Sequence, residues 1–116
     1  MTTCRRGDLV VVEVRYSDGT GSKRRPALVV SEDGYNRRLP DVMACPVSSQ
    51  PRYVEHPGPA DVPIAAWKPA GLRHPSAVRV GKTLAIDRGI VLRRLGRMPE
   101  ETMREVGLVL RRLLAL

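Results

Sequence analysis

Residues 8–16 alternate between apolar and polar side chains, and this alternation constrains the fold more than any other feature of the chain. The apolar members Val10, Val12 and Val14 fall on one side of an extended backbone, and polar residues fall on the other. This period of two is typical of a half-buried β-strand. The chain must therefore build a sheet with at least one buried face.

Two shorter apolar runs follow, and each contains a proline that limits how it can pair. Residues 26–30 predict a second strand, with Pro26 in the first position, where its missing N–H costs little. Residues 41–47 predict a third strand, and Pro46 places that strand at a sheet edge or at a bulge. The sheet is thus expected to be small and irregular.

The segments beyond these strands are broken by proline, which interrupts helices and sheet ladders alike. Six prolines lie between residues 51 and 75. The predicted elements are a flexible loop at 17–23, a basic loop at 37–40 into which 32–36 leads, strand-like pieces at 53–55 and 62–67, and short strands at 76–80 and 83–87. Residues 90–95 fit a strand or a helix, and a strand or short turn that ends at Gly96 is favoured.

The chain ends in a predicted amphipathic helix. Pro99 and the acidic pair after it suit the first turn, because acids complement the positive end of the helix dipole. An apolar stripe expected to pack on the sheet then consists of Met103, Val106, Leu110, Leu113 and Leu114. The predicted fold is α+β: a single domain over residues 1–116, with five or six short strands in a strongly bent barrel that the helix closes.

The charge balance favours a polyanionic partner. Twenty Lys and Arg residues face twelve Asp and Glu residues, which gives a net charge of +8. Each phosphate that a cation neutralises releases counterions, so RNA or DNA is the expected partner, and a solubilised, Arg-rich surface is the alternative.

Cys4 and Cys45 match neither a disulfide scaffold nor a zinc site. The sequence shows no signal peptide or membrane-spanning run, so the cytoplasm is the expected compartment.

Several kinds of catalytic site find no support in the sequence. Gly19 and Gly21 form a lone GxG in a hairpin loop rather than a phosphate-binding loop, and no acidic cluster is present to hold magnesium. His56 and His74 lie beside prolines in the irregular middle, where a histidine is more often solvated than catalytic, although imidazole is the commonest general base.

The remaining candidate is a pair formed by Arg25, which precedes the second strand, and Ser48, which follows the third. If these strands pair, a guanidinium and a hydroxyl face each other at one rim of the sheet. Such a pair can cleave RNA, because the 2′-hydroxyl is an internal nucleophile and the protein has only to stabilise a phosphorane and move two protons. The structural alternative is a surface ion pair and a turn. The supporting residues are Arg24, Asn36, Ser49, Gln50, Arg79 and Lys82.

Several short motifs carry a family resemblance by their order and spacing. They are Gly7-Asp8-Leu-Val, Arg25-Pro-Ala-Leu-Val-Val30, Tyr35-Asn36-Arg37, Cys45-Pro-Val-Ser-Ser-Gln50, Ala77-Val-Arg-Val80 and Ile86-Asp87, followed by the terminal helix. Together they resemble the MazF/PemK (Kid) family of toxins over nearly the whole chain.

The resemblance implies a CcdB-like, SH3-like barrel that forms a homodimer. It also implies a metal-independent endoribonuclease that needs no cofactor and cuts single-stranded mRNA into 2′,3′-cyclic phosphate and 5′-hydroxyl ends. A co-expressed antitoxin with an acidic, disordered tail would neutralise the toxin and provide its only link to DNA, and no membrane is involved. Transferred by position, Arg25 is the catalytic arginine and Ser48 the catalytic hydroxyl.

One segment departs from the family pattern. Many relatives carry Arg-x-Asp-Gln-x-Arg-Thr-Ile-Asp, whereas Gly81, Lys82 and Leu84 replace the first Asp, the Gln and the second Arg here. That Asp is the proposed base in the PemK/Kid branch, so either Arg25 and Ser48 suffice or the nuclease is weak or altered. The other classes left open are a non-catalytic toxin that binds gyrase, as CcdB does, and an SH3-like module that binds RNA.

Overall fold

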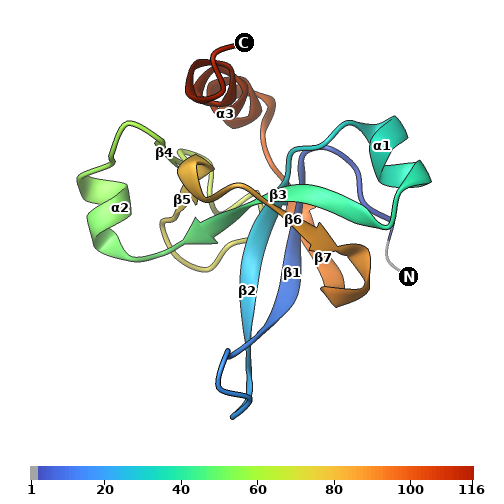
Figure 1. The fold of residues 1–116 in the computed structure, drawn as a ribbon. Coiled ribbons are helices and arrows are strands. Elements are labelled where there is room, and N and C mark those ends of the chain that lie inside the picture. The colour runs from blue at the N-terminus through green and yellow to red at the C-terminus, as the bar shows by residue number, and fades with distance from the viewer. Residues whose placement is uncertain (1–2) are drawn as a thin grey trace.

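A seven-stranded antiparallel sheet forms the body of the protein in the computed structural model, which describes residues 3–116 (Figure 1). The strands are β1 (Asp8–Arg15), β2 (Ser22–Val29), β3 (Asp41–Ser48), β4 (Asp61–Pro63), β5 (Ala77–Arg79), β6 (Leu84–Asp87) and β7 (Val91–Arg97). The helices are α1 (Asp33–Arg38), α2 (Pro51–Glu55) and α3 (Glu100–Leu113), with single 3₁₀ turns η1 (Val80–Lys82) and η2 (Arg88–Ile90). The α+β class is confirmed. Residues 1 and 2 of the predicted domain lie outside the described residues.

The strands follow the order β4-β5-β3-β2-β1-β7, and β6 pairs with β3 as well, so the sheet is open between β4 and β7. β1 is confirmed and forms with β2 a long hairpin that projects away from α3 (Figure 1).

β2 begins at Ser22, so the predicted loop at 17–23 is too long and Pro26 lies inside the strand. Pro26 is tolerated because β2 pairs with β3 only from Ala27 onward, which leaves its first half as an edge on that side.

β3 is confirmed as a strand and lies in the middle of the sheet. One edge pairs with β2, and the other pairs first with β6 and then with β5. The β6 ladder ends at Ala44 and the β5 ladder begins at Val47, so Pro46 lies in the gap between two ladders. A proline fits such a gap without the strand being at an edge. The short strands predicted at 76–80 and 83–87 are confirmed as β5 and β6.

Two short helices replace other predicted structures. α1 takes up part of the predicted loop at 37–40, because Glu32 caps it by accepting a hydrogen bond from the Tyr35 N–H at 2.8 Å. α2 replaces the strand-like piece at 53–55. Pro51 occupies its first turn, where a missing N–H leaves no bond unmade, and this outweighs the strand propensity of the residues that follow.

The proline-rich segment between β4 and β5 packs against the edge strand β7. The strand predicted at 62–67 is mostly turn, since β4 ends at Pro63. Gly96 of β7 lies so close to this segment that a Cβ atom on it would come within 2.3 Å of the Ala70 carbonyl oxygen. Only a residue without a side chain permits this contact, which holds residues 70–71 against β7.

Apolar side chains form a core on each face of the central strands. One core contains Leu9, Leu28 and Val47, and the other contains their alternating neighbours such as Val10 and Val29. α3 covers the first core with Met103, Val106 and Leu110. Leu113 and Leu114 are 50% and 60% exposed, so the predicted stripe packs only up to Leu110. No helix among residues 3–116 is long and apolar enough to cross a membrane.

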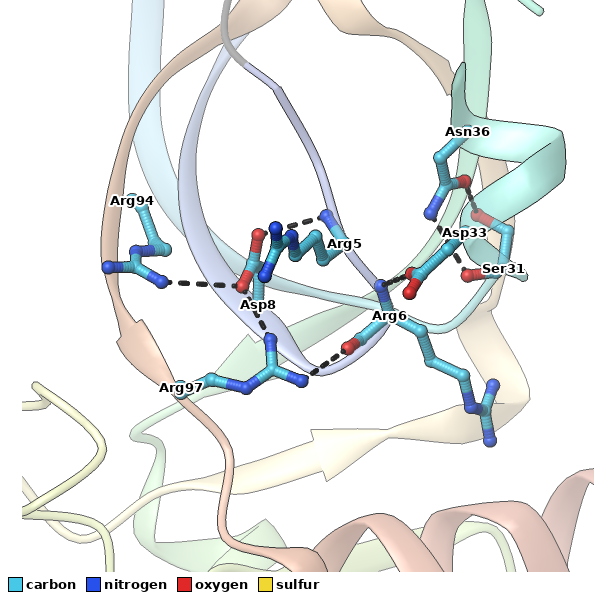
Figure 2. A network of polar contacts seen from close by, with 8 residues as sticks. All are labelled: Arg5, Arg6, Asp8, Ser31, Asp33, Asn36, Arg94 and Arg97. Atoms are coloured by element: carbon cyan, nitrogen blue, oxygen red, sulfur yellow. Dashed lines mark hydrogen bonds and ion pairs between the residues drawn. The ribbon is translucent and has the colours of Figure 1, made fainter. Parts of the chain in front are cut away.

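Asp8 ties the start of β1 to β7 (Figure 2). Its buried carboxylate accepts hydrogen bonds from the Arg5 backbone N–H at 2.9 Å and from Arg97 Nη1 at 3.0 Å. Arg94 lies 3.7 Å from the same carboxylate, and Arg97 also donates to the Arg6 carbonyl at 3.2 Å. A buried carboxylate is stable only with partners of this kind, so Asp8 fixes how the N-terminal turn meets the sheet.

Candidate functional site

A cavity of about 470 Å³ opens where β2 and β3 separate. The two strands pair as far as Ala27 and Pro46 and then part, and the rest of the lining comes from residues 71–76, β1 and β7. Besides arginines, its polar lining residues are Ser48, Ser49, Gln50, His74 and Ser76. We refer to this cavity as the main cavity.

Arg25 and Ser48 lie just beyond the paired part of β2 and β3. Ala27 and Pro46 are the last paired residues on this side, and Arg25 precedes Ala27 by two residues while Ser48 follows Pro46 by two. Both residues line the main cavity. The prediction that the two strands pair is therefore confirmed, and both residues lie at the cavity where the strands part.

Four arginines line the main cavity: Arg24, Arg25, Arg73 and Arg93. They come from β2, β7 and the segment before β5, and no Asp or Glu is among the lining residues. None of the four forms an ion pair with another described residue. Guanidinium groups bind phosphate oxygens in a bidentate manner, so this concentration of cations is suited to a phosphate chain.

Ser48 keeps a hydroxyl proton for a ligand. Its Oγ accepts a hydrogen bond from the Gln50 backbone N–H at 3.2 Å, and accepting a bond does not use the proton. Gln50 is also the residue that precedes α2, so the short helix holds the end of β3 in place. The half-buried Ser48 thus faces the cavity from a firmly held strand end.

The structure brings together some of the other predicted binding residues and separates the rest. Arg24, Ser49 and Gln50 line the main cavity, whereas Asn36 does not. Asn36 is 1% exposed, and its amide group bonds to Ser31 through the Ser31 hydroxyl at 2.5 Å and the Ser31 carbonyl at 3.0 Å (Figure 2). Ser31 Oγ in turn accepts a hydrogen bond from the Met43 N–H of β3 at 3.0 Å. The Asn36 side chain is therefore used inside the fold and does not reach the surface that RNA could contact.

Arg79 and Lys82 also lie outside the lining of the main cavity. Arg79 Nε donates to Asp61 at 2.7 Å, and its guanidinium lies 3.8 Å from the centre of the Tyr53 ring. Arg52 lies over the same ring at 4.6 Å, so Tyr53 is flanked by two cations. Lys82 is exposed in η1.

The sequence did not indicate the lining residues Arg73, Ser76 and Arg93, and it favoured a solvated His74 over a catalytic one. Arg73 and His74 lie in a segment without regular structure, and the contacts of residues 70–71 with β7 hold that segment beside the cavity. A Cβ atom on Gly71 would lie 2.7 Å from the Leu95 carbonyl oxygen. The run of prolines gave no period from which such a return could be predicted.

The two thiols and the acidic residues add no second site. Burial raises the pKa of the Cys45 thiol, although a bond with Thr83 Oγ1 at 3.0 Å partly opposes this. Burial also raises the pKa of Cys4. Neither thiol lines the main cavity, and a raised pKa makes each a poor nucleophile. The described residues contain no group of three or more His, Cys, Asp or Glu that could share a metal ion.

Comparison with protein families relates almost the whole chain to one group. Residues 5–114 match the family described as PemK-like, MazF-like toxin of type II toxin-antitoxin system. The endoribonuclease MazF6 of Mycobacterium tuberculosis is 33% identical over 96 residues, which cover 82% of each chain.

Solved structures show the same architecture. The MazE–MazF complex of Deinococcus radiodurans superposes with a TM-score of 0.83 at 27% identity, covering 100% of this chain and 99% of that chain. An endoribonuclease in complex with its cognate antitoxin from a mycobacterial species superposes at 0.76 and 22% identity, covering 100% and 97%. The second likeness concerns the fold alone.

Proposed function

The chain belongs to the PemK-like, MazF-like toxins of type II toxin–antitoxin systems, and we propose that it is the endoribonuclease of such a system. Its proposed substrate is single-stranded mRNA, cut at short sequences. The observation that carries this proposal is the main cavity, where four arginines and the Ser48 hydroxyl converge without a carboxylate among the lining residues. Such a lining favours a polyanionic chain over neutral or cationic ligands.

Arg25 and Ser48 form the proposed catalytic pair. The 2′-hydroxyl attacks the adjacent phosphorus, the new P–O2′ bond forms as the P–O5′ bond breaks, and a 2′,3′-cyclic phosphate and a 5′-hydroxyl result. The Arg25 guanidinium binds two non-bridging oxygens and offsets the charge that develops on the phosphorane. Ser48 donates a hydrogen bond to the scissile phosphate or to the leaving oxygen. Because the nucleophile belongs to the substrate, the reaction is proposed to need no metal-bound water and no cofactor.

The other arginines extend this site along the RNA backbone. Arg24, Arg73 and Arg93 supply further cations in the same cavity as the catalytic pair, and Ser49 and Gln50 supply neutral donors at the end of β3. Lys82 is proposed to contact a phosphate further along the strand, since it is exposed but outside the main cavity. Arg79 is proposed to act indirectly, because Asp61 and Tyr53 already hold its guanidinium.

The proposed assembly is a cytoplasmic homodimer that a cognate antitoxin neutralises. A solved structure similar to this chain is a MazE–MazF complex, and an acidic, disordered antitoxin segment is complementary to the arginines of the main cavity. Contact with DNA is proposed to occur only through the antitoxin. Residues 1–116 are proposed to form one domain, and the open, bent sheet is proposed to be a version of the SH3-like barrel.

A second candidate is a non-catalytic toxin that binds a protein such as gyrase. The observation in its favour is the apolar end of the chain, where Leu113, Leu114 and Leu116 are 50%, 60% and 82% exposed. An exposed apolar cluster at the end of a helix is a common protein-binding feature. This candidate gives no role to the arginine-lined cavity, and for that reason it ranks second.

The test is cleavage of a mixed single-stranded RNA by the purified protein in EDTA. We expect discrete fragments with cyclic phosphate ends, and a loss of at least ~100-fold in rate for Arg25→Ala and for Ser48→Ala. Arg104→Ala, on the exposed face of α3, is the matched control and should cleave normally. Cleavage that persists in both site variants would contradict the assignment of the pair. Absence of cleavage together with inhibition of gyrase supercoiling would favour the second candidate.

A further inference from the structure

His74 lies at the junction of two hollows. It lines the main cavity together with Arg25 and Ser48, and it also lines an adjacent pocket of about 440 Å³. The side pocket, as we call the latter, is formed by Ser49, Pro51, Val54, Glu55, His74 and Pro75. An imidazole at this junction is accessible to a ligand from either hollow.

The backbone around His74 is held on both sides. Pro75 restricts the backbone of the residue before it to extended conformations. The buried Ser76 donates from Oγ to the His74 carbonyl at 2.9 Å, and the Ser76 carbonyl accepts from the Ile64 N–H at 3.0 Å. On the other side, Gly71 lies against the Leu95 backbone. His74 is therefore part of a fixed wall of the cavity, although it has no regular secondary structure.

The chemistry proposed for the main cavity requires a group that accepts a proton. The 2′-hydroxyl must lose its proton as it attacks, and the lining residues offer arginines, hydroxyls and an amide but no carboxylate. Arginine stays protonated under ordinary conditions, and a neutral hydroxyl or amide is a weak base. Imidazole is the one side chain that ordinarily changes its charge between about pH 5 and 8. Among the lining residues, only His74 is suited to this task.

We propose that His74 is a catalytic residue and acts as the general base of the cleavage reaction. This inference rests on the proposed function. The neutral imidazole accepts the proton of the 2′-hydroxyl as the P–O2′ bond forms and the P–O5′ bond breaks. The departing 5′-oxygen takes a proton from the Ser48 hydroxyl, which recovers one from water, and the imidazolium returns its proton to solvent.

Charged groups face His74 from several elements. The main cavity brings Arg24 and Arg25 from β2, Arg73 from its own segment and Arg93 from β7. The side pocket brings Glu55 from α2. The arginines stabilise the negative charge that develops on the attacking oxygen and on the phosphorane. Removal of the proton by His74 and stabilisation of this charge therefore take place at the same phosphate.

The experiment compares His74→Gln with His56→Gln. His56 is exposed at the end of α2 and lines neither hollow, so it is a matched control with the same change in chemistry. Circular dichroism and thermal unfolding establish that each variant is folded. We expect kcat/KM to fall at least ~100-fold in His74→Gln and to stay unchanged in His56→Gln. Affinity for an RNA with a 2′-deoxy nucleotide at the scissile position should change less than twofold in either variant.

The pH dependence identifies the role. In the wild type, kcat/KM should rise with pH over the acidic range as the imidazole loses its proton, and His74→Gln should lose this dependence. A substrate with a 5′-sulfur leaving group needs no acid, so it should leave the His74→Gln defect in place. Restoration of the variant by that substrate would overturn the base role, and so would an unchanged acidic limb or a parallel loss of RNA affinity. Absence of wild-type cleavage would instead contradict the proposed function itself.

Discussion

Arg79 and Asp61 form a hydrogen-bonded ion pair at 2.7 Å that joins β5 to β4. The register sets these two residues opposite each other, and the Arg79 guanidinium rests on the Tyr53 ring of α2. One arginine thus links two strands and a helix beside the main cavity. A cation engaged in this way is a support for the site, whereas the arginines inside the cavity are free of ion pairs with described residues.

Arg93→Gln should weaken RNA binding in a salt-dependent manner, and Arg79→Gln should not. Removal of one phosphate contact lowers the slope of log affinity against log salt by roughly 0.7 for a single strand. We therefore expect this change for Arg93 and an unchanged slope for Arg79, measured by fluorescence anisotropy with a 2′-deoxy-substituted RNA. Equal slope changes in the two variants would show that Arg79 also contacts phosphate.

Gly96→Ala should destabilise the fold, whereas Gly107→Ala should stabilise it. A Cβ atom at Gly96 would lie 2.3 Å from the Ala70 carbonyl oxygen, so the wall of the main cavity would have to move. A Cβ atom at Gly107, inside α3, meets only the end of Arg6 at 3.8 Å, and alanine is a better helix former by about 0.5–1 kcal/mol. Urea unfolding measures both changes. Gly96→Ala should also slow RNA cleavage, because the new Cβ atom would displace the segment that carries His74.

Asp8→Asn should cost roughly 1–3 kcal/mol of unfolding free energy, because it weakens the acceptor for two hydrogen bonds at a buried position. The Asp8 side chain is 3% exposed, while Arg94 and Arg97 beside it are each 56% exposed and can turn to water. Glu105→Gln, on the exposed face of α3, is the control and should change stability by less than about 0.5 kcal/mol. A similar midpoint for both variants in urea would contradict the role given to Asp8.

Stability should decline at alkaline pH in part because of Cys45. Burial raises its pKa in the folded state above the ordinary value of 9.0, so the folded protein keeps the proton that the unfolded chain releases. The stabilisation is complete below the ordinary value and is lost as the pH rises through the higher folded one. Urea midpoints at pH 8 and pH 10 should therefore differ less in Cys45→Ala than in the wild type. An equal difference in both would exclude Cys45 as a source.

The strands with a clear period were predictable from the sequence. The alternation over residues 8–16 and the apolar run at 41–47 correspond to β1 and β3, and the helix at α3 follows from its start and its spacing. The short helices were not predictable in this way. α1 depends on its cap at Glu32, and α2 depends on Pro51 in its first turn. In each helix, this single residue outweighs the intrinsic propensity of the residues that follow it.

Some residues of the candidate site were likewise predictable from the sequence, and others were not. Arg25 lies within β2 and Ser48 ends β3. The pairing of these two strands could be inferred from the sequence, and both residues line the main cavity where the strands part. Asn36 looked like a surface amide because its neighbours are polar, and only the fold shows it turned inward to Ser31. His74 enters the main cavity through a backbone contact at Gly71, which leaves no trace in local patterning.

The cations in the first half of β2 also protect an unpaired strand edge. Residues 22–26 pair with β1 on one side, and no described strand pairs with them on the other. An unpaired strand of this kind can recruit another chain by edge-to-edge pairing, which leads to aggregation. Here the exposed edge carries Lys23, Arg24 and Arg25 followed by Pro26, residues that oppose such pairing. Variants that remove these cations to disarm the cavity will also remove a barrier to self-association, so their solubility will fall along with their activity.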